Sequence, residues 1–312
     1  MKKIKNYLKK VLFDFQKKRN LHTSFVFENR SQGKEKLCLI LIGYKPLLWK
    51  AVLGRLKKFV PNDVDVCLTS SGKYCEELSK LCLKNNWSYL STKKNNLCLA
   101  MNVTIKQFKE ALYIYKLDED MFISKGFFET LFETSSYVND NTIYNVGIVA
   151  PLIPINGFGY YYLLKKYDQL EQFEKQFGKS KITCGEEKES TFTRDCRIPP
   201  YFWNRSNPLS DIDSMNLSAQ HSSFSFLICP IRFSIGAILF SRKLWEDMGM
   251  FTVHGGNGLA SDEIQICEYC NSHSQSIVVS ENSIVGHFAY GPQTGNMFSY
   301  FDENQDIFFT KE

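Results

Sequence analysis

The stretch ALYIYKLDEDMFI, residues 111–123, decides the fold class of this chain. Its apolar run ends abruptly in three acids, Asp118, Glu119 and Asp120, and apolar residues follow at once. A buried strand that ends in concentrated negative charge needs a cation against it, because burying an unpaired carboxylate is costly. The cation is either a divalent metal, which shares its remaining positions with substrate phosphates, or a basic side chain. Ligands of open α/β sheets bind beyond the carboxyl ends of the strands, so the acids mark a candidate ligand site.

The chain around this stretch alternates short apolar runs with longer helical segments. Strands are expected at residues 37–42, 64–68, 87–90, 113–117 and 145–150, and helices at 47–59, 74–84 and 97–110. This alternation is typical of a mostly parallel sheet with helices on its faces. The sequence therefore predicts an α/β, Rossmann-like fold.

Residues 151–232 break this pattern. They contain six prolines and two aromatic clusters, at 160–162 and 201–203. Flat aromatic faces suit sugar rings, but such clusters more often reflect local packing. An insertion of this length is usually functional or mobile. Regularity returns after it, with a strand expected at 233–240 and a helix opening at Ser261.

The composition bounds the class of protein. The 312 residues are 44% hydrophobic, which suffices for one large or two small domains, and they contain no apolar run long enough to span a bilayer. The ten cysteines are scattered, and no secretory pattern opens the sequence, so we expect reduced thiols in a cytoplasmic protein. Cys267 and Cys270 have metal-like spacing, but no second pair completes a zinc site.

The basic charge is concentrated at the start of the chain. Residues 1–20 hold eight basic side chains and one acid, whereas the whole chain has a net charge of +5. Their apolar residues recur at helical spacing, which predicts a basic amphipathic helix. Such a helix contacts an anionic membrane surface, or it docks on its own domain with a solvated lysine face. Since the rest of the chain is mildly acidic, no nucleic-acid partner is expected.

An ordered set of landmarks resembles the GT-A glycosyltransferases, similar to the large family 2-like group that uses nucleotide sugars. The resemblance covers roughly residues 37–150 and 233–290. The matching landmarks are Leu99-Ala100-Met101-Asn102 for an Ala-Arg-Asn helix, Asp118-Glu119-Asp120 for the Asp-x-Asp motif, Gly236-Ala237 with Arg242 and Gly249, Ser261-Asp262-Glu263 for a Glu-Asp pair, and His287 for a late histidine.

The resemblance implies a GT-A fold in which successive segments of the chain have different roles. Residues 1–36 form the amphipathic helix and a linker, 37–150 the nucleotide-sugar-binding half, 151–232 an insertion and possible acceptor region, and 233–312 the acceptor and catalytic half. The implied site residues are Asp118, Asp120 and His287 for Mn²⁺ or Mg²⁺; Asp118, Tyr44, Asn102 and Gly236 for the donor; and Glu263, with Asp262 second, for the catalytic base.

These residue types suit sugar transfer. A divalent metal stabilises the charge that develops on a diphosphate leaving group. A carboxylate within hydrogen-bond reach of the acceptor hydroxyl acts as general base, typically accelerating the reaction 10²–10⁴-fold. Here Glu263 is the first candidate for that base, although the order Asp262-Glu263 reverses the usual Glu-Asp order and leaves the choice between them open.

The expected activity is therefore a metal-dependent glycosyltransferase of the hexosyltransferase type. It moves a sugar from a nucleoside diphosphate, with UDP as the expected nucleotide, to a hydroxyl of a carbohydrate or glycolipid acceptor, with inversion. The expected setting is bacterial surface glycan synthesis in the cytoplasm, peripheral at the inner membrane face. Two alternatives stay open: a nucleotidyltransferase, for which the loop 43–46 offers only one glycine and one lysine, and a non-catalytic carbohydrate-binding scaffold.

Overall fold

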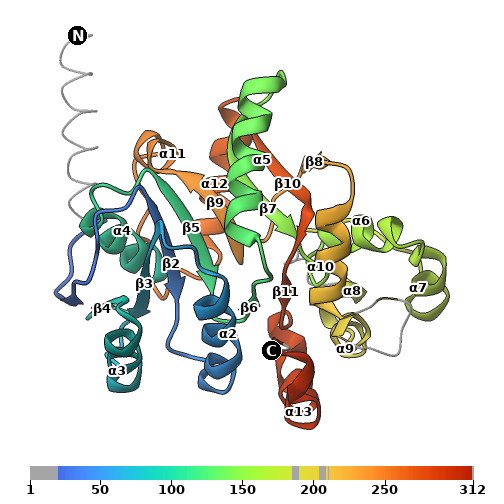
Figure 1. The fold of residues 1–312 in the computed structure, drawn as a ribbon, viewed down its shortest axis with the longest axis horizontal. Coiled ribbons are helices and arrows are strands. Elements are labelled where there is room, and N and C mark those ends of the chain that lie inside the picture. The colour runs from blue at the N-terminus through green and yellow to red at the C-terminus, as the bar shows by residue number, and fades with distance from the viewer. Residues whose placement is uncertain (1–19, 185–189, 204–208, 210, 311–312) are drawn as a thin grey trace. The chain divides into compact units, whose positions relative to one another are not determined.

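Strands and helices alternate along the chain as the sequence predicts (Figure 1). The structure, a computed structural model, describes residues 20–184, 190–203, 209 and 211–310. These residues form two compact units. Unit 1 consists of the residues up to Tyr44, Asn62–Leu117 and Phe240–Tyr269. Unit 2 consists of Lys45–Pro61, Asp118–Leu239 and the residues from Cys270 on. The predicted basic helix at 1–20 lies, except for Asn20, outside the described residues.

Within the described residues the main sheet has nine strands, most of them parallel to a neighbour. The predicted α/β class, with a large and mostly parallel sheet flanked by helices, is confirmed. In unit 1 the strand order is β1-β4-β3-β2-β5. The strands of this unit are β1 (Phe25–Glu28), β2 (Lys36–Leu41), β3 (Val64–Ser71), β4 (Ser88–Thr92) and β5 (Tyr113–Asp118).

Every residue of β3 and β4 is buried, as expected for parallel strands covered on both faces. The helices of unit 1 are α3 (Glu76–Asn85), α4 (Leu97–Gln107), α11 (Arg242–Asp247) and α12 (Ser261–Ser272), the last of which ends in unit 2. Helix α4 begins at Asn96, whose side chain accepts a hydrogen bond from the Leu99 N–H. That cap fixes the start of the predicted helix.

The predicted linker at 21–36 is wrong in part, because it contains β1. This strand pairs antiparallel with β4, and Phe25 and Val26 remain exposed at the edge of the sheet. The segment after it is held by Asp65, whose carboxylate accepts from the Ser31 hydroxyl and from the Gln32 N–H. A four-residue edge strand with two of its three apolar side chains exposed gives too short a pattern to identify from sequence.

Unit 2 contains the strands β7-β10-β8 in that order, with β7 and β10 parallel and β8 antiparallel to β10. A separate two-stranded sheet pairs β6 with β11. The bounds are α2 (Pro46–Phe59), β6 (Met121–Phe122), α5 (Phe127–Asn141), β7 (Asn145–Leu152), β8 (Phe226–Ile228), β10 (Gln275–Ile284), β11 (Gly286–His287) and α13 (Thr294–Glu303); β9 (Ala237–Ser241) contains the boundary between the units.

The described part of the insertion at 151–232 contains five helices, although the sequence analysis predicted no regular elements there. Its helices are α6 (Gly159–Lys166), α7 (Leu170–Phe177), α8 (Thr191–Arg194), α9 (Ile198–Trp203) and α10 (Ile212–His221). The aromatic clusters pack locally: Tyr160 stacks on Phe192 with ring centroids 3.9 Å apart, and Phe173 meets Tyr201 edge-on at 5.4 Å. The packing interpretation is therefore correct for the buried rings.

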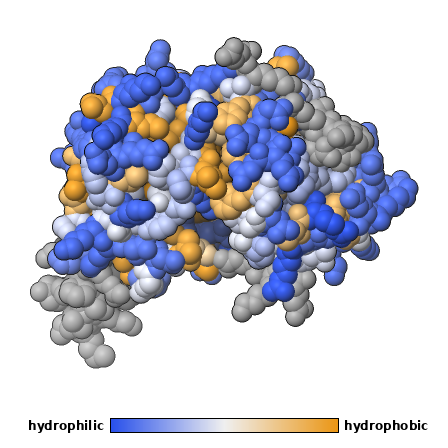
Figure 2. Space-filling model, turned by 90° about the horizontal axis from the view of Figure 1, so that it is seen from below, coloured by the Kyte–Doolittle hydropathy of each residue, from blue (hydrophilic) through white to orange (hydrophobic). Residues whose placement is uncertain are grey.

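The ten cysteines are free thiols, and seven of them are buried. Burial raises the pKa of the Cys98 and Cys270 thiols to about 12, so these groups stay protonated. None of the helices that the structure describes has the length and the apolar character needed to cross a membrane. On the face seen in Figure 2, hydrophilic residues predominate and the apolar ones form small groups among them.

Candidate functional site

The short sheet of β6 and β11 places an acid beside the late histidine. His287 pairs with Met121 across this sheet, and the Phe288 N–H donates to the Asp120 carbonyl at 3.0 Å. The His287 Nε2 and the Asp120 Oδ2 are consequently 3.7 Å apart. Asp120 and His287, predicted from the sequence as partners in one site, are adjacent.

Hydrogen bonds fix the orientation of the His287 ring. Its Nδ1 lies 2.7 Å from the Ile155 carbonyl, which can only accept, so Nδ1 carries the hydrogen. The Nε2 that faces Asp120 then has a lone pair in the neutral imidazole. A cation placed between that lone pair and the carboxylate would contact both groups. The backbone is held as well, because Trp203 of α9 donates from Nε1 to the His287 carbonyl at 3.1 Å.

A lysine contacts the same carboxylate. The Lys45 ammonium donates to the Asp120 Oδ2. Burial alone would lower the pKa of Lys45, but Asp120, Asp118 and Glu119 outweigh it and raise that pKa above its usual value. Burial would likewise raise the pKa of Asp120, but Lys45 and His287 hold it below its ordinary range. The Asp120 side chain is thus ionised and is paired with a cation from this chain.

Glu119, the middle acid of the triplet, holds the backbone of Lys45 in place. Its Oε2 accepts from the Lys45 backbone N–H at 3.0 Å and from the Trp49 Nε1 at 2.8 Å. Lys45 is the N-cap of α2, so Glu119 anchors the start of that helix beside the acids. The sequence analysis gave no role to Glu119, Trp49 or Lys45 here. The position of Lys45 directly after the first predicted strand was the available signal, but its pairing depends on tertiary structure.

Gly236 positions the first acid. The Asp118 N–H donates to the Gly236 carbonyl at 2.8 Å. A Cβ at position 236 would lie 2.8 Å from the Met121 Sδ and 3.6 Å from the Asp118 Oδ2. Glycine is needed because these groups approach closely, so Gly236 acts on the site by positioning Asp118.

Asp120 and His287 are suited to hold a divalent metal as two of its ligands. Across the part of the chain that the structure describes, no group of three or more His, Cys, Asp or Glu side chains is arranged to hold a metal ion. Asp120 offers one oxygen and His287 one nitrogen, and the other ring nitrogen of His287 donates to a backbone carbonyl, as metal-bound histidines usually do. Magnesium-type sites commonly use one or two protein ligands together with substrate phosphates.

Of the predicted residues in unit 1, Asn102 is fully engaged in packing. Its Nδ2 donates to the carbonyls of Asn20 and Phe251, and its Oδ1 accepts from the Trp245 Nε1 and the Phe251 N–H. The residue is completely buried, and all four hydrogen-bonding positions of its side chain are used. The structure therefore gives Asn102 a structural role in place of the predicted donor-binding one.

The two candidate bases lie in the first turn of α12, where acids are favoured by the helix dipole. The Asp262 carboxylate is buried, and its Oδ2 lies 3.7 Å from the Nζ of Lys116, which is also buried. That ion pair joins the start of α12 to β5 within unit 1. Glu263 is half-buried on the same turn, so Asp262 carries a structural contact and Glu263 stays the first candidate.

Tyr44 keeps an accessible ring. Its hydroxyl donates to the Ser71 carbonyl at 2.5 Å and lies 3.1 Å from the Asn95 Oδ1. The residue is nevertheless 57% exposed. A ring that is anchored at its hydroxyl and exposed on its face can stack on a base, which keeps the predicted role of Tyr44 open.

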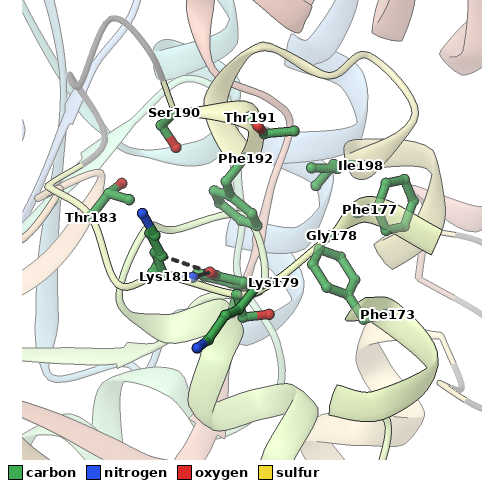
Figure 3. Close-up of a pocket in the computed structure, with 12 residues that line it drawn as sticks. Phe173, Phe177, Gly178, Lys179, Lys181, Thr183, Ser190, Thr191, Phe192 and Ile198 are labelled. Atoms are coloured by element: carbon green, nitrogen blue, oxygen red, sulfur yellow. Dashed lines mark hydrogen bonds between the residues drawn. The ribbon is translucent and has the colours of Figure 1, made fainter. Parts of the chain in front are cut away.

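The insertion holds a cavity of about 310 Å³ (Figure 3). Aromatic and apolar side chains, Phe173, Phe177 and Ile198, gather at one end of it. At the other end Thr183 and Ser190 lie near Lys181, whose backbone carbonyl accepts from the Tyr160 hydroxyl. The cavity therefore has an apolar end and a polar end that carries hydroxyl groups.

Two of the solved structures to which this chain is similar are the following. One is GalNAc-T7 with UDP, GalNAc and Mn²⁺, at 13% identity over 89% of this chain and 50% of that chain, with a TM-score of 0.47. The other is the mannosyltransferase PcManGT from Pyrobaculum calidifontis with GDP-Man and Mn²⁺, at 11% identity over 89% and 64% of the two chains, with a TM-score of 0.48. This chain thus spans 50–64% of their lengths. No protein-family model and no curated protein matches the sequence.

Proposed function

We propose that this protein is a glycosyltransferase of the GT-A type that transfers a sugar from a nucleoside diphosphate donor to a hydroxyl acceptor. The observation that carries the proposal is the convergence of Asp120, His287 and Lys45 beyond the end of β5. A carboxylate, an imidazole and an ammonium at the carboxyl end of a sheet strand suit a ligand with concentrated negative charge. A diphosphate leaving group is such a ligand.

The chain's residues take separate parts in the reaction. When bound by Asp120 and His287, Mn²⁺ or Mg²⁺ would supply Lewis-acid stabilisation of the leaving diphosphate. Asp118, held by Gly236, contributes further acceptor oxygens for the donor ribose or the cation. The exposed ring of Tyr44 stacks on the nucleotide base, which we propose to be uracil.

Transfer requires one bond to form and one to break. The acceptor hydroxyl oxygen attacks the anomeric carbon, the bond from that carbon to the diphosphate oxygen breaks, and the hydroxyl proton passes to a carboxylate. Glu263 is the proposed base, because Asp262 is already paired with Lys116. A single displacement of this kind inverts the anomeric centre.

The acceptor is proposed to be a carbohydrate or glycolipid bound by the insertion. The support is the cavity between α7 and α8, which combines aromatic side chains with hydroxyls. The proposed setting is surface glycan synthesis by a cytoplasmic bacterial enzyme that contacts anionic membrane through residues 1–20, and the transferred sugar is proposed to be a hexose.

The test is a ligand panel read by thermal stability. Nucleoside diphosphates and nucleotide sugars are each added with Mn²⁺, Mg²⁺ or EDTA to the wild type and to Asp120→Asn. A ligand specific for the folded protein stabilises it by about 2.7 kcal/mol at a hundredfold excess over its Kd. We expect one nucleotide to raise the melting temperature with metal present, and that shift to be absent in Asp120→Asn.

Turnover decides whether the site is catalytic. The nucleotide sugar chosen by the panel is incubated with hydroxyl acceptors, and the released nucleoside diphosphate is quantified with the anomeric configuration of the product. Glu263→Gln should bind the donor normally and lose activity by about 10²-fold or more. If no nucleotide shifts the melting temperature of the wild type, the transferase proposal is wrong.

A further inference from the structure

We propose that Lys45 is a cation built into the donor site, which competes with the divalent metal for Asp120 and pairs with the diphosphate of the donor. The competition for Asp120 follows from the described contacts, whereas the diphosphate contact rests on the proposed function. The chemical class of ligand is any diphosphate that brings a divalent cation with it. Lys45 thus has two partners at different stages of the catalytic cycle.

The first argument is that Lys45 and a metal need the same atom. The Lys45 ammonium and the His287 Nε2 both approach the Oδ2 of Asp120. That oxygen and that nitrogen are the two atoms that suit a metal ion. A divalent cation beside an ammonium is repelled by it, so Asp120 cannot hold both at full strength. Binding of metal by Asp120 therefore displaces the Lys45 ammonium.

The second argument is that Lys45 can move while its backbone stays in place. Glu119 fixes the Lys45 N–H, which leaves the four-carbon side chain as the moving part. The Lys45 side chain is 30% exposed, whereas that of Asp120 is only 8% exposed. Part of the Lys45 side chain is therefore accessible to a ligand that binds beside Asp120.

A second buried ion pair in this chain shows what a purely structural lysine looks like. In the Lys116–Asp262 pair of unit 1 the side chains are 3% and 6% exposed. Neither partner of that pair reaches solvent, so it can only join β5 to α12. The asymmetry of exposure at Lys45 distinguishes it from this structural pair and suits a residue that contacts a ligand.

The experiment measures Mn²⁺ binding to the purified protein without any nucleotide, by titration calorimetry and by the electron paramagnetic resonance signal of free Mn²⁺. Lys45→Met should bind Mn²⁺ at least tenfold more tightly than the wild type, because Asp120 has lost its competing cation. Lys50→Met is the matched control: Lys50 lies exposed on the same helix and should leave the affinity unchanged. Asp120→Asn should abolish the binding.

Pyrophosphate binding, measured at saturating Mn²⁺, then tests whether Lys45 contacts the diphosphate. Lys45→Met should bind pyrophosphate at least tenfold more weakly than the wild type, and Lys50→Met should match the wild type. Lys45→Gln retains a hydrogen-bond donor for Asp120 without the charge, and it serves if Lys45→Met fails to fold. It should repeat both effects.

Three results would overturn the inference. Equal Mn²⁺ affinity in Lys45→Met and the wild type means that Lys45 does not compete for Asp120. Undiminished pyrophosphate binding means that it does not contact phosphate. Retention of Mn²⁺ by Asp120→Asn means that the metal binds elsewhere. None of these probes needs sugar transfer, so the inference can hold even if the enzyme proves to use another reaction, and it can fail while transferase activity is present.

Discussion

At the scale of single residues, the site depends on close approaches that few substitutions tolerate. Gly236 is the clearest case, since its carbonyl accepts from Asp118 and its Cα hydrogen faces Met121. The sequence resemblance marked this glycine as donor-binding. Its geometry indicates that it positions Asp118, a role that only the packing around it could reveal.

Gly236→Ala should disturb the site without unfolding the protein. The added methyl group would lie 2.8 Å from the Met121 Sδ, so that side chain must shift, and Met121 belongs to the short strand that follows Asp120. We expect the Mn²⁺ affinity to fall about tenfold and the melting temperature to fall by a few degrees, since overpacking costs about 1–3 kcal/mol. An unchanged Mn²⁺ affinity would show that position 236 does not control the acids.

Asp120 predicts a pH dependence of stability. Because its pKa is lower in the folded protein than in the unfolded chain, its contribution is fully present above the unfolded pKa of about 4 and is lost as the pH falls toward the folded pKa. The stability difference between the wild type and Asp120→Asn should thus be largest near neutral pH and should shrink below about pH 4. Melting temperatures of both proteins between pH 3 and 7 test this, and a difference that grows on acidification contradicts it.

At the scale of elements, helix α9 supports the backbone of His287. A Cβ at Gly286 would meet the Trp203 ring at 2.5 Å, and the Trp203 Nε1 donates to the His287 carbonyl. The aromatic cluster at 201–203, read from the sequence as either sugar-binding or packing, therefore orients β11. The insertion contributes to the site through this buried contact.

Trp203→Phe should weaken metal binding severalfold. The smaller ring keeps most of the apolar packing but removes the hydrogen bond to His287, and losing such an indirect support typically costs up to 10–100-fold in metal affinity. Calorimetric titration with Mn²⁺ measures the change. Phe177→Leu, at the mouth of the insertion cavity, is the control and should not alter the affinity.

Within unit 2, a buried arginine holds helix α2 against other segments of the same unit. Arg55 donates to both oxygens of Asp213 on α10 and to the carbonyls of Phe308 and Ile123. Its side chain is 1% exposed, whereas that of Asp213 is 36% exposed. One residue thus joins three segments that are distant in sequence.

Asp213→Ala should destabilise the protein substantially, because it leaves the Arg55 charge buried without its partner. Breaking a fully buried pair costs about 3–5 kcal/mol, and the exposure of Asp213 reduces our expectation to roughly 2–3 kcal/mol. The urea midpoint measures the loss. Removal of Glu76 from its exposed pair with Lys80 on α3 should leave the midpoint unchanged.

At the scale of the whole molecule, the sequence predicts the elements whose pattern is local. The runs that became β2, β3 and β5 are apolar and bounded by helical segments, so their positions followed from periodicity. The helices of the insertion could not be predicted in this way, because their cohesion comes from ring contacts between separate helices such as Tyr160 with Phe192. Edge strand β1 was not predicted from the sequence, because too few of its side chains are buried to give a strand pattern.

The sequence predicted those residues of the candidate site whose side-chain type and order along the chain are distinctive. Asp120 and His287 stood out as an acid triplet and a late histidine, and the structure brings them to 3.7 Å. Asn102 looked equally functional in the sequence, yet its hydrogen bonds serve the packing of unit 1. Pairings such as Lys45 with Asp120 depend on tertiary contacts that no local pattern encodes.

The pairing of β6 with β11 has a consequence for biosynthesis. His287 is synthesised after Asp120 by the time needed to translate the 167 residues from Met121 to His287, roughly 10–30 s at typical rates. During that interval the nascent chain has its acids but lacks their imidazole. Lys45, translated earlier than both, is already available to neutralise Asp120. The basic partner that Asp120 has in the folded protein is therefore synthesised before the acid, and the histidine is synthesised last.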